Sequence, residues 1–266
     1  MSSPVSVVEL QRAWAAVSAG EFRSRESGNR RRHSADTWSP TEPVVVVAGA
    51  TGRVGASTIA LAIATASERR VRLIECASMR ATGLAAATTA ELGVTNTGWR
   101  RGNRDQILIE RTTTGTYQRP DDLPAPDEAD CDLTIVDASW DLATIGLGDS
   151  WLTTAIETAP LVVVTVATVP GLRMLDNALH MIGHPADTWS VVIGPKYKKW
   201  PPPLRLATTH TIEEAIASGR LITVPTTPSL ALKGLTPDPL PAGLVNACRP
   251  ILDQAVGLPK GHHHDV

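Results

Sequence analysis

The sequence predicts an α/β fold, a doubly wound and mostly parallel sheet with helices on both faces. From residue 43 onward, short apolar runs alternate with segments of helical pattern, which is the order that builds a parallel sheet. The runs consist almost entirely of Val, Ile and Leu, as in 44–47 and 161–164, and a glycine-rich turn follows the first of them. The 266 residues are enough to bury one full α/β core with an extra segment, or two small domains.

The expected elements follow one another in chain order. We expect strands at 44–47, 71–75, 106–110, 133–136, 161–166, 190–193 and 221–224. We expect helices at 57–67, 83–92, 171–182, 211–218 and 240–256. The polar residues 95–105 and the Pro- and Asp-rich residues 111–130 predict irregular connections.

This pattern divides the chain into three parts. Residues 1–42 predict a short helix with an apolar side, followed by a flexible arm that carries an arginine cluster. Residues 43–258 predict the folded α/β domain. Residues 259–266 predict an unstructured tail, whose three histidines could bind metal only adventitiously.

The bulk composition limits the classes of function. A net charge of −2 predicts no general affinity for nucleic acid or anionic membrane, although a local patch could bind either. Cys76, Cys131 and Cys248 form no CxxC pair, which predicts reduced thiols in a cytoplasmic protein. No apolar run approaches about 18 residues and no signal-peptide pattern is found, so we expect neither a membrane span nor secretion.

Residues 44–58 predict a phosphate-binding loop between a strand and a helix. In such loops the backbone N–H groups and the helix N-terminus hold phosphate oxygens, and a lysine reaches the β- and γ-phosphates. Ala56 stands where this lysine is expected, directly before Ser57 and Thr58. The loop therefore keeps the signal of the fold but lacks its main cation.

The loop and the order of elements over residues 43–256 resemble the ParA/MinD family of deviant-Walker P-loop ATPases, which position plasmids, chromosomes, division sites and other cargo. The family pattern, KGGxGK followed by two Ser or Thr residues, lines up with residues 51–58. The residues that match are Gly52, Gly55, Ser57 and Thr58. The resemblance implies that Ser57 binds Mg²⁺ and that Thr58 faces the α-phosphate of ATP.

The departures from the family pattern fall at residues that the family uses to bind and hydrolyse ATP. Thr51 and Ala56 replace the family's two lysines, and Arg53 replaces a glycine and could supply one positive charge. Ala77 stands where the family has the aspartate that orients the attacking water, and a methyl group cannot position water. Asp137 is retained at the end of a strand, where the resemblance implies that it holds the metal through a water.

A second interpretation stays open, because the loop also fits the GxxGxxG pattern of atypical short-chain dehydrogenases. Its glycines would be Gly49, Gly52 and Gly55, and Glu75 at the end of the second strand would hold the ribose of NAD(P). In the ParA/MinD interpretation, Glu75 occupies the first position of the family's Asp-x-Asp. No Tyr-x-x-x-Lys pair is present, which disfavours the dehydrogenase.

Three further features have a functional and a structural interpretation. Residues 195–203 mix lysines, aromatics and prolines, and we favour an exposed loop over a nucleic-acid contact. Trp140 and Trp151 could lie in a partner interface, and we expect core packing for one of them. His180 and His184 have the spacing of a metal-binding pair, but a glycine and a proline predict that the helix ends between them.

We therefore predict a degenerate ParA/MinD-like protein, an adaptor or regulator in cargo positioning, partition or a related transport or secretion machine, with weak or absent ATP hydrolysis. ATP or ADP with Mg²⁺ would bind weakly or not at all. The candidate nucleotide-binding residues are Gly52, Arg53, Gly55, Ser57, Thr58, Glu75 and Asp137, of which Ser57 and Asp137 would bind Mg²⁺ once a nucleotide is present.

Partners follow from the same residues. We favour a protein partner, at the N-terminal arm or near Trp140 and Trp151, over DNA, and a homodimer stays open. Two alternatives to the adaptor remain. One is a nucleotide-dependent dimeric switch that still binds ATP, and the other is the dehydrogenase-like NAD(P)-binding protein.

Overall fold

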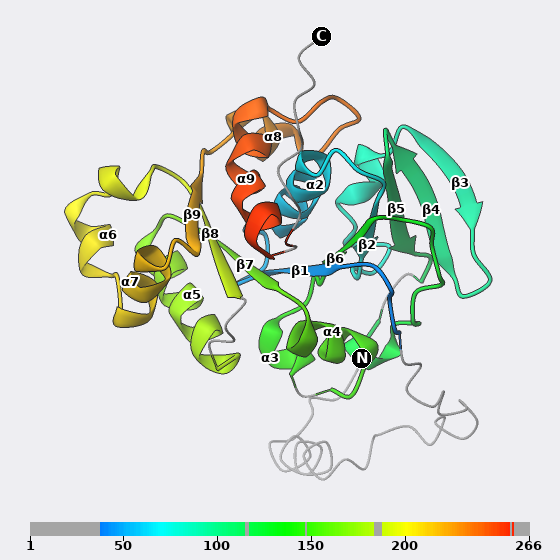
Figure 1. Cartoon of the computed structure of the whole chain (residues 1–266), viewed down its shortest axis with the longest axis horizontal. Coiled ribbons are helices and arrows are strands. Elements are labelled where there is room, and N and C mark those ends of the chain that lie inside the picture. Colours follow the sequence, from blue (N-terminus) through cyan, green and yellow to red (C-terminus); the bar gives the residue numbers. More distant parts are fainter. Residues whose placement is uncertain (1–37, 115–116, 147, 184–187, 256, 258–266) are drawn as a thin grey trace, which may run out of the picture. The chain divides into compact units, whose positions relative to one another are not determined.

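In the part of the chain that the structure describes, nine strands form a single sheet in the order β3-β4-β5-β2-β6-β1-β7-β8-β9 (Figure 1). The computed structural model describes residues 38–114, 117–146, 148–183, 188–255 and 257. The strands are β1 (Val44–Gly49), β2 (Val71–Glu75), β3 (Ala90–Val94), β4 (Trp99–Arg104), β5 (Ile107–Thr112), β6 (Leu133–Asp137), β7 (Leu161–Val166), β8 (Thr188–Ile193) and β9 (Leu221–Val224). Neighbouring strands from β5 to β9 are all parallel, and β4 runs antiparallel to β3 and β5. The predicted α/β fold is confirmed.

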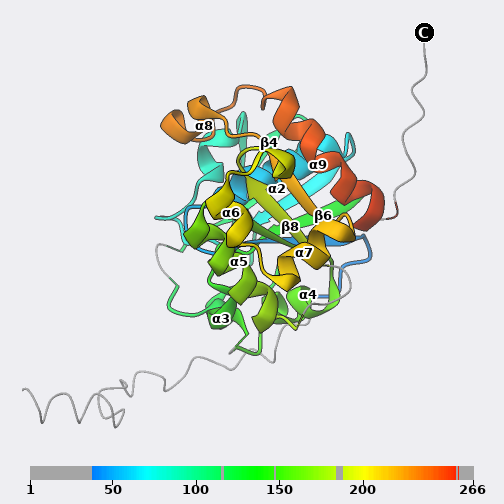
Figure 2. The same ribbon diagram turned by 90° about the vertical axis from the view of Figure 1, so that its left-hand side faces the viewer.

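Helices cover both faces of this sheet (Figure 2). One face carries α2 (Ala56–Ala66), α8 (Pro228–Lys233) and α9 (Ala242–Ala255). The other carries α3 (Leu142–Ile145), α4 (Trp151–Thr158), α5 (Val169–Met181), α6 (Pro202–Leu206) and α7 (His210–Ala217). Short 3₁₀ helices are η2 (Leu84–Ala87), η3 (Pro120–Asp122) and η4 (Tyr197–Lys199). Two apolar cores, one on each face, join these layers. In the part of the chain that the structure describes, no helix has the length and apolar character to cross a membrane.

The predicted arm at 1–42 and tail at 259–266 lie outside the described residues, except for 38–42. The Trp38 ring packs edge-on against Trp151, with ring centroids 5.2 Å apart. Glu42 accepts a hydrogen bond from the hydroxyl of Thr134 on β6. Residues 38–42 therefore contact the folded domain.

The arrangement of three central strands positions the candidate site. Strand β6 lies between β1 and β2. Asp137 of β6 stands opposite Val47 of β1 and opposite Glu75 of β2 in the two parallel registers. Because parallel strands end at the same edge of a sheet, the loops that follow all three strands gather there.

Two predictions between residues 83 and 105 are wrong. The alanine-rich stretch predicted as a helix contains η2 and then β3, and the polar stretch predicted as irregular contains β4. Helix propensity is a weak prior, and pairing with a neighbouring strand overrides it here. Gly93, at φ +105°, and the bulge between Glu91 and Gly93 are incompatible with a continuous helix.

Residues 195–203 are exposed, as we favoured, except for Trp200, although they contain η4 and the start of α6 rather than an irregular loop. Trp200 is buried, and its indole N–H donates a hydrogen bond to the carbonyl oxygen of Pro195 at 3.0 Å. Pro202 and Pro203 begin α6, where proline is tolerated because the first helical N–H groups need no partner within the helix. The lysines of this stretch remain exposed.

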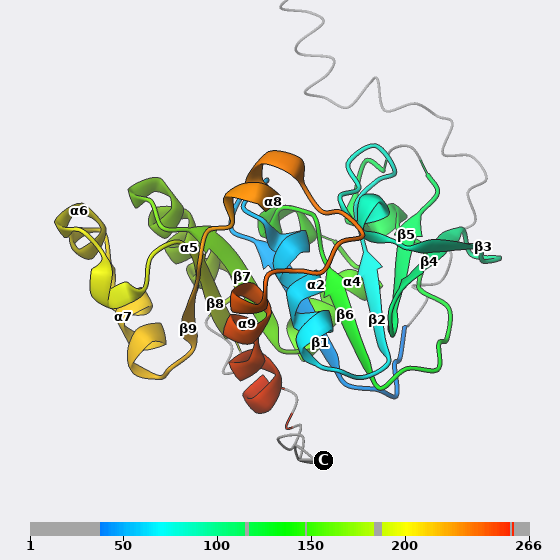
Figure 3. The ribbon, with the colours of Figure 1, turned by 90° about the horizontal axis from the view of Figure 1, so that it is seen from above.

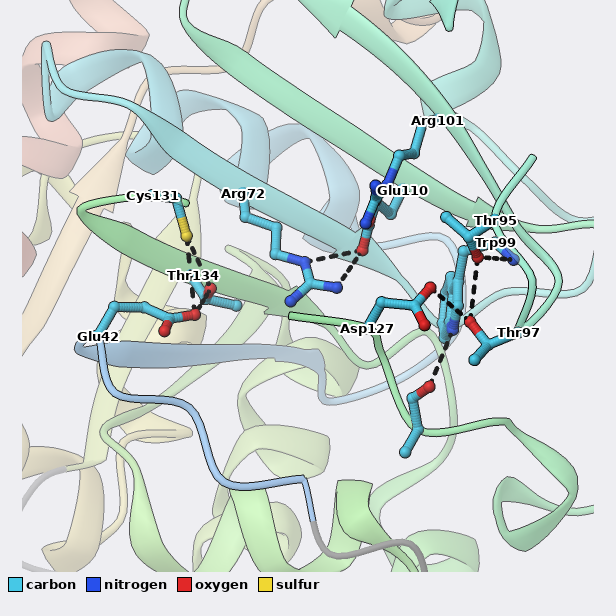
Figure 4. Close-up of polar contacts among 11 residues, drawn as sticks. Glu42, Arg72, Thr95, Thr97, Trp99, Arg101, Glu110, Asp127, Cys131 and Thr134 are labelled. Atoms are coloured by element: carbon cyan, nitrogen blue, oxygen red, sulfur yellow. Dashed lines mark hydrogen bonds and ion pairs between the residues drawn. The ribbon is translucent and has the colours of Figure 1, made fainter. Parts of the chain in front are cut away.

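A buried ion network joins β2, β4 and β5 (Figure 4). The Arg72 guanidinium donates two hydrogen bonds to Oε2 of Glu110, at 2.7 and 2.5 Å, and Arg101 donates one to Oε1 at 2.6 Å. Arg72 and Glu110 are both buried, with exposed fractions of 1% and 0%. Burying a charge costs solvation free energy that only close pairing offsets, so the three groups depend on one another. The network ties the antiparallel edge to the parallel sheet.

We predict that Glu110→Ala lowers the free energy of unfolding by about 3–5 kcal/mol, because it leaves the buried Arg72 guanidinium without a counter-charge. Urea unfolding followed by circular dichroism measures this loss. The exposed pair of Arg70 and Asp130 provides the control, and Asp130→Asn should leave stability close to that of the wild type. Equal losses in the two variants would contradict the role assigned to the buried network.

Candidate functional site

The predicted phosphate-binding loop joins β1 to α2 at the C-terminal edge of the sheet. Gly49 leaves β1 at a point where a Cβ atom would lie 2.5 Å from the carbonyl oxygen of Thr51, so only glycine fits. Gly55, at φ +91°, turns the chain into α2. No side chain among the described residues caps α2, and its first turn holds no acidic residue. The first N–H groups of α2 are therefore available to an anion.

Arg53 is the one charged residue between 50 and 58. Its side chain is exposed, and its backbone lies in the left-handed region at φ +63°. That conformation costs a residue with a Cβ atom about 1–2 kcal/mol. Ala56, at the first position of α2, brings no charge. The cation of this loop therefore sits three residues earlier than the expected lysine.

Asp137, the last residue of β6, lies beside the start of α2. Its carboxyl is fully buried, and the Ser57 hydroxyl is close enough to lower its pKa. Neither carboxyl oxygen accepts a hydrogen bond of normal length and angle from a described residue. Buried polar atoms nearly always have a partner, so this carboxyl is a candidate for binding a water or a ligand from outside the chain.

The protonation of Asp137 depends on its surroundings. Burial and, second, the charge of Glu75 raise the pKa of Asp137 to about 7, although the Ser57 and Ser139 hydroxyls act in the opposite direction. Glu75 and Asp137 stand opposite each other on neighbouring strands, which explains their mutual effect. A bound cation would favour the ionised carboxylate of Asp137.

Glu75 is held by its own chain. Its Oε1 accepts hydrogen bonds from the N–H groups of Gly83, at 2.7 Å, and Leu84, at 3.2 Å, and the Thr82 hydroxyl donates to Oε2. Burial raises the pKa of Glu75, although these three hydrogen bonds lower it. Glu75 thus anchors the loop that follows β2, and the same oxygens would have to leave this loop to bind a ribose.

Ser139 is a site residue that the sequence analysis did not single out. It follows β6 in the left-handed conformation, at φ +56°, and its hydroxyl approaches Asp137 closely enough to affect the pKa. A small hydroxyl residue two positions after an acid at a strand end was the available signal. Ala77, at the position of the family's water-orienting acid, is buried.

The two tryptophans after Asp137 have different surroundings. Trp151 begins α4 and is buried, and its ring packs edge-on against Trp38 and Trp99. Trp140 is half-buried, and its indole N–H donates to the carbonyl oxygen of Cys76 at 3.0 Å. Core packing, which we predicted for one of the two, is confirmed for Trp151, and a partner contact at Trp140 stays a prediction.

The residues present fit a magnesium ion that binds together with a nucleotide. Within the described ranges, no group of three or more His, Cys, Asp or Glu residues could hold a metal. His180 approaches the carbonyl oxygen of Asp176 at 2.8 Å, and His184 lies outside the described residues. Ser57 and Asp137 offer the hydroxyl and carboxylate oxygens that Mg²⁺ accepts, and phosphate oxygens and waters normally complete such a site.

Comparisons with known proteins show which fold this chain shares. No protein-family model matches the sequence, and a comparison with curated proteins finds no match. The MinC:MinD cell division complex from Aquifex aeolicus matches with a TM-score of 0.50 and 15% identity, over 81% of this chain and 98% of that chain. A variant of Cyanothece McdA in complex with ATP matches with a TM-score of 0.50 and 12% identity, over 84% and 99%. A plasmid partition protein from Borrelia burgdorferi bound to AMPPNP has a TM-score of 0.49 and 12% identity, over 80% and 97%.

Identities this low show the fold alone. The chain therefore has the α/β fold of ParA/MinD-like P-loop proteins, as the resemblance in the sequence implies. The strand order differs from the common dinucleotide-binding order, which places the first two strands side by side, because β6 separates β1 from β2 here. The dehydrogenase interpretation gains no support from the fold.

We predict that Asp137 makes the free energy of unfolding fall as the pH rises. The pKa of an aspartate is ordinarily 3.8, and that of Asp137 in the fold is about 7, so the folded state binds the proton more tightly. The resulting stabilisation is complete below about pH 4, is lost as the pH rises through 7, and amounts to about 4 kcal/mol at most. Asp137→Asn cannot ionise and should lack this part of the pH dependence.

Urea unfolding of both proteins at pH 5 and pH 8.5 tests this prediction. Glu75 titrates in the same direction, so the variant should retain a smaller slope. The exposed Asp141 caps α3, and Asp141→Asn preserves that cap, so this control should keep the wild-type pH dependence. Parallel pH profiles for the wild type and Asp137→Asn would show that Asp137 does not titrate as assigned.

Proposed function

We propose that this chain is a ParA/MinD-like nucleotide-binding protein that acts as an adaptor or regulator in cargo positioning or partition, with ATP hydrolysis weak or absent. One observation supports the proposal most. The buried Asp137 carboxyl, which accepts no hydrogen bond of normal length and angle from a described residue, lies beside Ser57 at the uncapped start of α2, in a loop that carries Ala56 where a lysine is expected.

Nucleotide binding is proposed from the groups that remain. The free N–H groups at the start of α2 and the charge of Arg53 would hold phosphate oxygens. Ser57 and Asp137 would hold Mg²⁺, which when bound neutralises charge on the phosphates. A loop with fewer cations should bind the nucleotide more weakly than a complete one. Among the similar structures, McdA is described with ATP.

Weak hydrolysis is proposed from the groups that are missing. Phosphoryl transfer depends mainly on positioning and on electrostatic stabilisation of the transferring group. Thr51 and Ala56 carry no positive charge, and the buried methyl group of Ala77 cannot orient a water. A protein of this kind would act through what it binds. The similar MinD structure is of a cell division protein in complex with MinC, which supports a protein partner here.

A second candidate is a dimeric switch that binds ATP and hydrolyses it slowly. The exposure of residues 51–53 at the tip of the loop favours it, because a second subunit could reach the bound phosphates there. The two candidates share the nucleotide site and differ in whether nucleotide changes the oligomeric state. Light scattering with and without ATP·Mg²⁺ separates them.

Calorimetric titration with ATP·Mg²⁺ and with NADPH, together with an assay of phosphate release, tests the proposal. We expect weak binding of ATP·Mg²⁺, no binding of NADPH and phosphate release at background. Asp137→Ala should weaken the binding of ATP·Mg²⁺, because it removes a metal ligand. Turnover comparable to that of an active ATPase, abolished in Asp137→Ala, would contradict the loss of hydrolysis, and a failure to bind any nucleotide would contradict the proposed function.

We predict that Ala56→Lys raises the affinity for ATP about tenfold or more, because a charge-assisted hydrogen bond contributes about 1.5–3 kcal/mol. The backbone of α2 can accept this change, since Ala56 is its first residue and is half-buried. Ala56→Gln, a side chain of similar length without charge, is the matched control and should change the affinity little. Equal affinities in the two variants would mean that the loop does not receive phosphate.

A further inference from the structure

Strand β3 is an uncovered edge of the sheet (Figure 3). All five residues of β3 are exposed, and no described strand pairs with its outer side. At the opposite edge, the residues of β9 are half-buried or buried against α7 and α9. An uncovered edge presents backbone N–H and C=O groups that can pair with a further strand.

Hydrogen bonds between the β3 and β4 segments show which backbone N–H and C=O groups face outward, away from β4. Thr95 donates its N–H inward, to the carbonyl oxygen of Trp99 at 2.8 Å. Because these groups alternate along a strand, the N–H and C=O of Val94 face the free edge. The bulge between Glu91 and Gly93 interrupts the strand, which limits the regular free edge to a few residues.

The exposed side chains of this edge include two large apolar residues and Glu91, the one charged residue of β3, which is paired with Arg111 of β5. Leu92 and Val94 have exposed fractions of 58% and 52%. Val94 stands opposite Arg100 of β4, so their side chains share a face. Arg100 is exposed and forms no ion pair with a described residue, whereas Arg111, which stands opposite it on β5, is paired with Glu91 at 2.5 Å.

We propose that β3 is the docking edge for a short extended segment of a partner protein, which adds as a further strand and pairs an acidic side chain with Arg100. Main-chain hydrogen bonds to the free edge would supply affinity, and the aliphatic stems of the acidic side chains would lie beside Val94, on the face that Val94 shares with Arg100. The charge of Arg100 selects an acidic segment over a basic one.

A second copy of this chain is a poorer occupant. Two β3 edges placed together would bring the unpaired Arg100 charges near each other, and like charges across an interface are unfavourable. A strand of five residues is only about 17 Å long, so two such edges paired together would bury much less than the roughly 1,200 Å² of a stable interface. The bulge also opposes flat pairing between copies. A short peptide segment needs no such area for weak binding.

Fluorescence anisotropy with a labelled Glu-Val-Glu-Val-Glu-Val peptide tests the docking edge, with Lys-Val-Lys-Val-Lys-Val as the opposite-charge probe. The wild type should bind the acidic peptide more tightly. Arg100→Glu should lower that affinity about five- to tenfold and favour the basic peptide instead, and Arg100→Lys should keep the wild-type preference. Arg173→Glu, which reverses an exposed arginine on α5, is the matched control and should change neither affinity.

Amide hydrogen exchange locates the peptide. Bound acidic peptide should slow exchange in residues 90–94, where the N–H of Val94 gains a partner. Circular dichroism of each variant checks that the fold is kept. The proposal is overturned if the acidic peptide does not bind at millimolar concentration, if Arg100→Glu and Arg173→Glu bind it equally, or if residues 90–94 gain no protection. These outcomes do not depend on nucleotide, so they leave the proposed function untouched.

Discussion

Backbone pairing of β6 with β1 on one side and β2 on the other positions the candidate site. This pairing places Asp137 opposite Val47, close to the start of the candidate phosphate-binding loop, and opposite Glu75. The Ser57 hydroxyl on α2 then comes close enough to lower the pKa of Asp137. The closeness of the Ser57 hydroxyl to the buried Asp137 carboxyl therefore depends on the strand order and on the turn at Gly55, and not on the side chain of residue 56.

Burying two carboxyl groups next to each other on neighbouring strands is unfavourable, and the hydrogen bonds around Glu75 and Asp137 differ. Glu75 receives three hydrogen bonds from the loop after β2, which compensate for its burial. Asp137 receives none of normal geometry from a described residue, and its pKa rises to about 7. A buried acid whose burial is not compensated by hydrogen bonds, at the sheet edge where the loops gather, is a candidate functional residue. Glu75 is better explained as a structural anchor.

The sequence predicted the parallel part of the fold because its strands are apolar on both faces, as at β1 and β7. The resemblance of the loop and of one strand end to the ParA/MinD pattern also pointed to Ser57 and Asp137, which lie close together in the structure, and nucleotide binding by the predicted site residues stays a prediction. It could not predict β4, which carries three arginines and a glycine and shows no apolar alternation. Nor could a local pattern predict the Arg72–Glu110 pair, which joins residues far apart in the chain. The hydrogen bonds that hold Glu75 depend in the same way on tertiary structure.

Amide hydrogen exchange of residues 50–58, measured with Mg²⁺ and a non-hydrolysable ATP analogue, tests the central claim most directly. Nucleotide held by the start of α2 should slow the exchange of the N–H groups between Gly52 and Thr58. The effect should need Mg²⁺, because Ser57 and Asp137 are proposed to act through the metal, and it should shrink in Asp137→Asn. Unchanged exchange in this loop at saturating nucleotide, or protection confined to another part of the chain, would contradict the account.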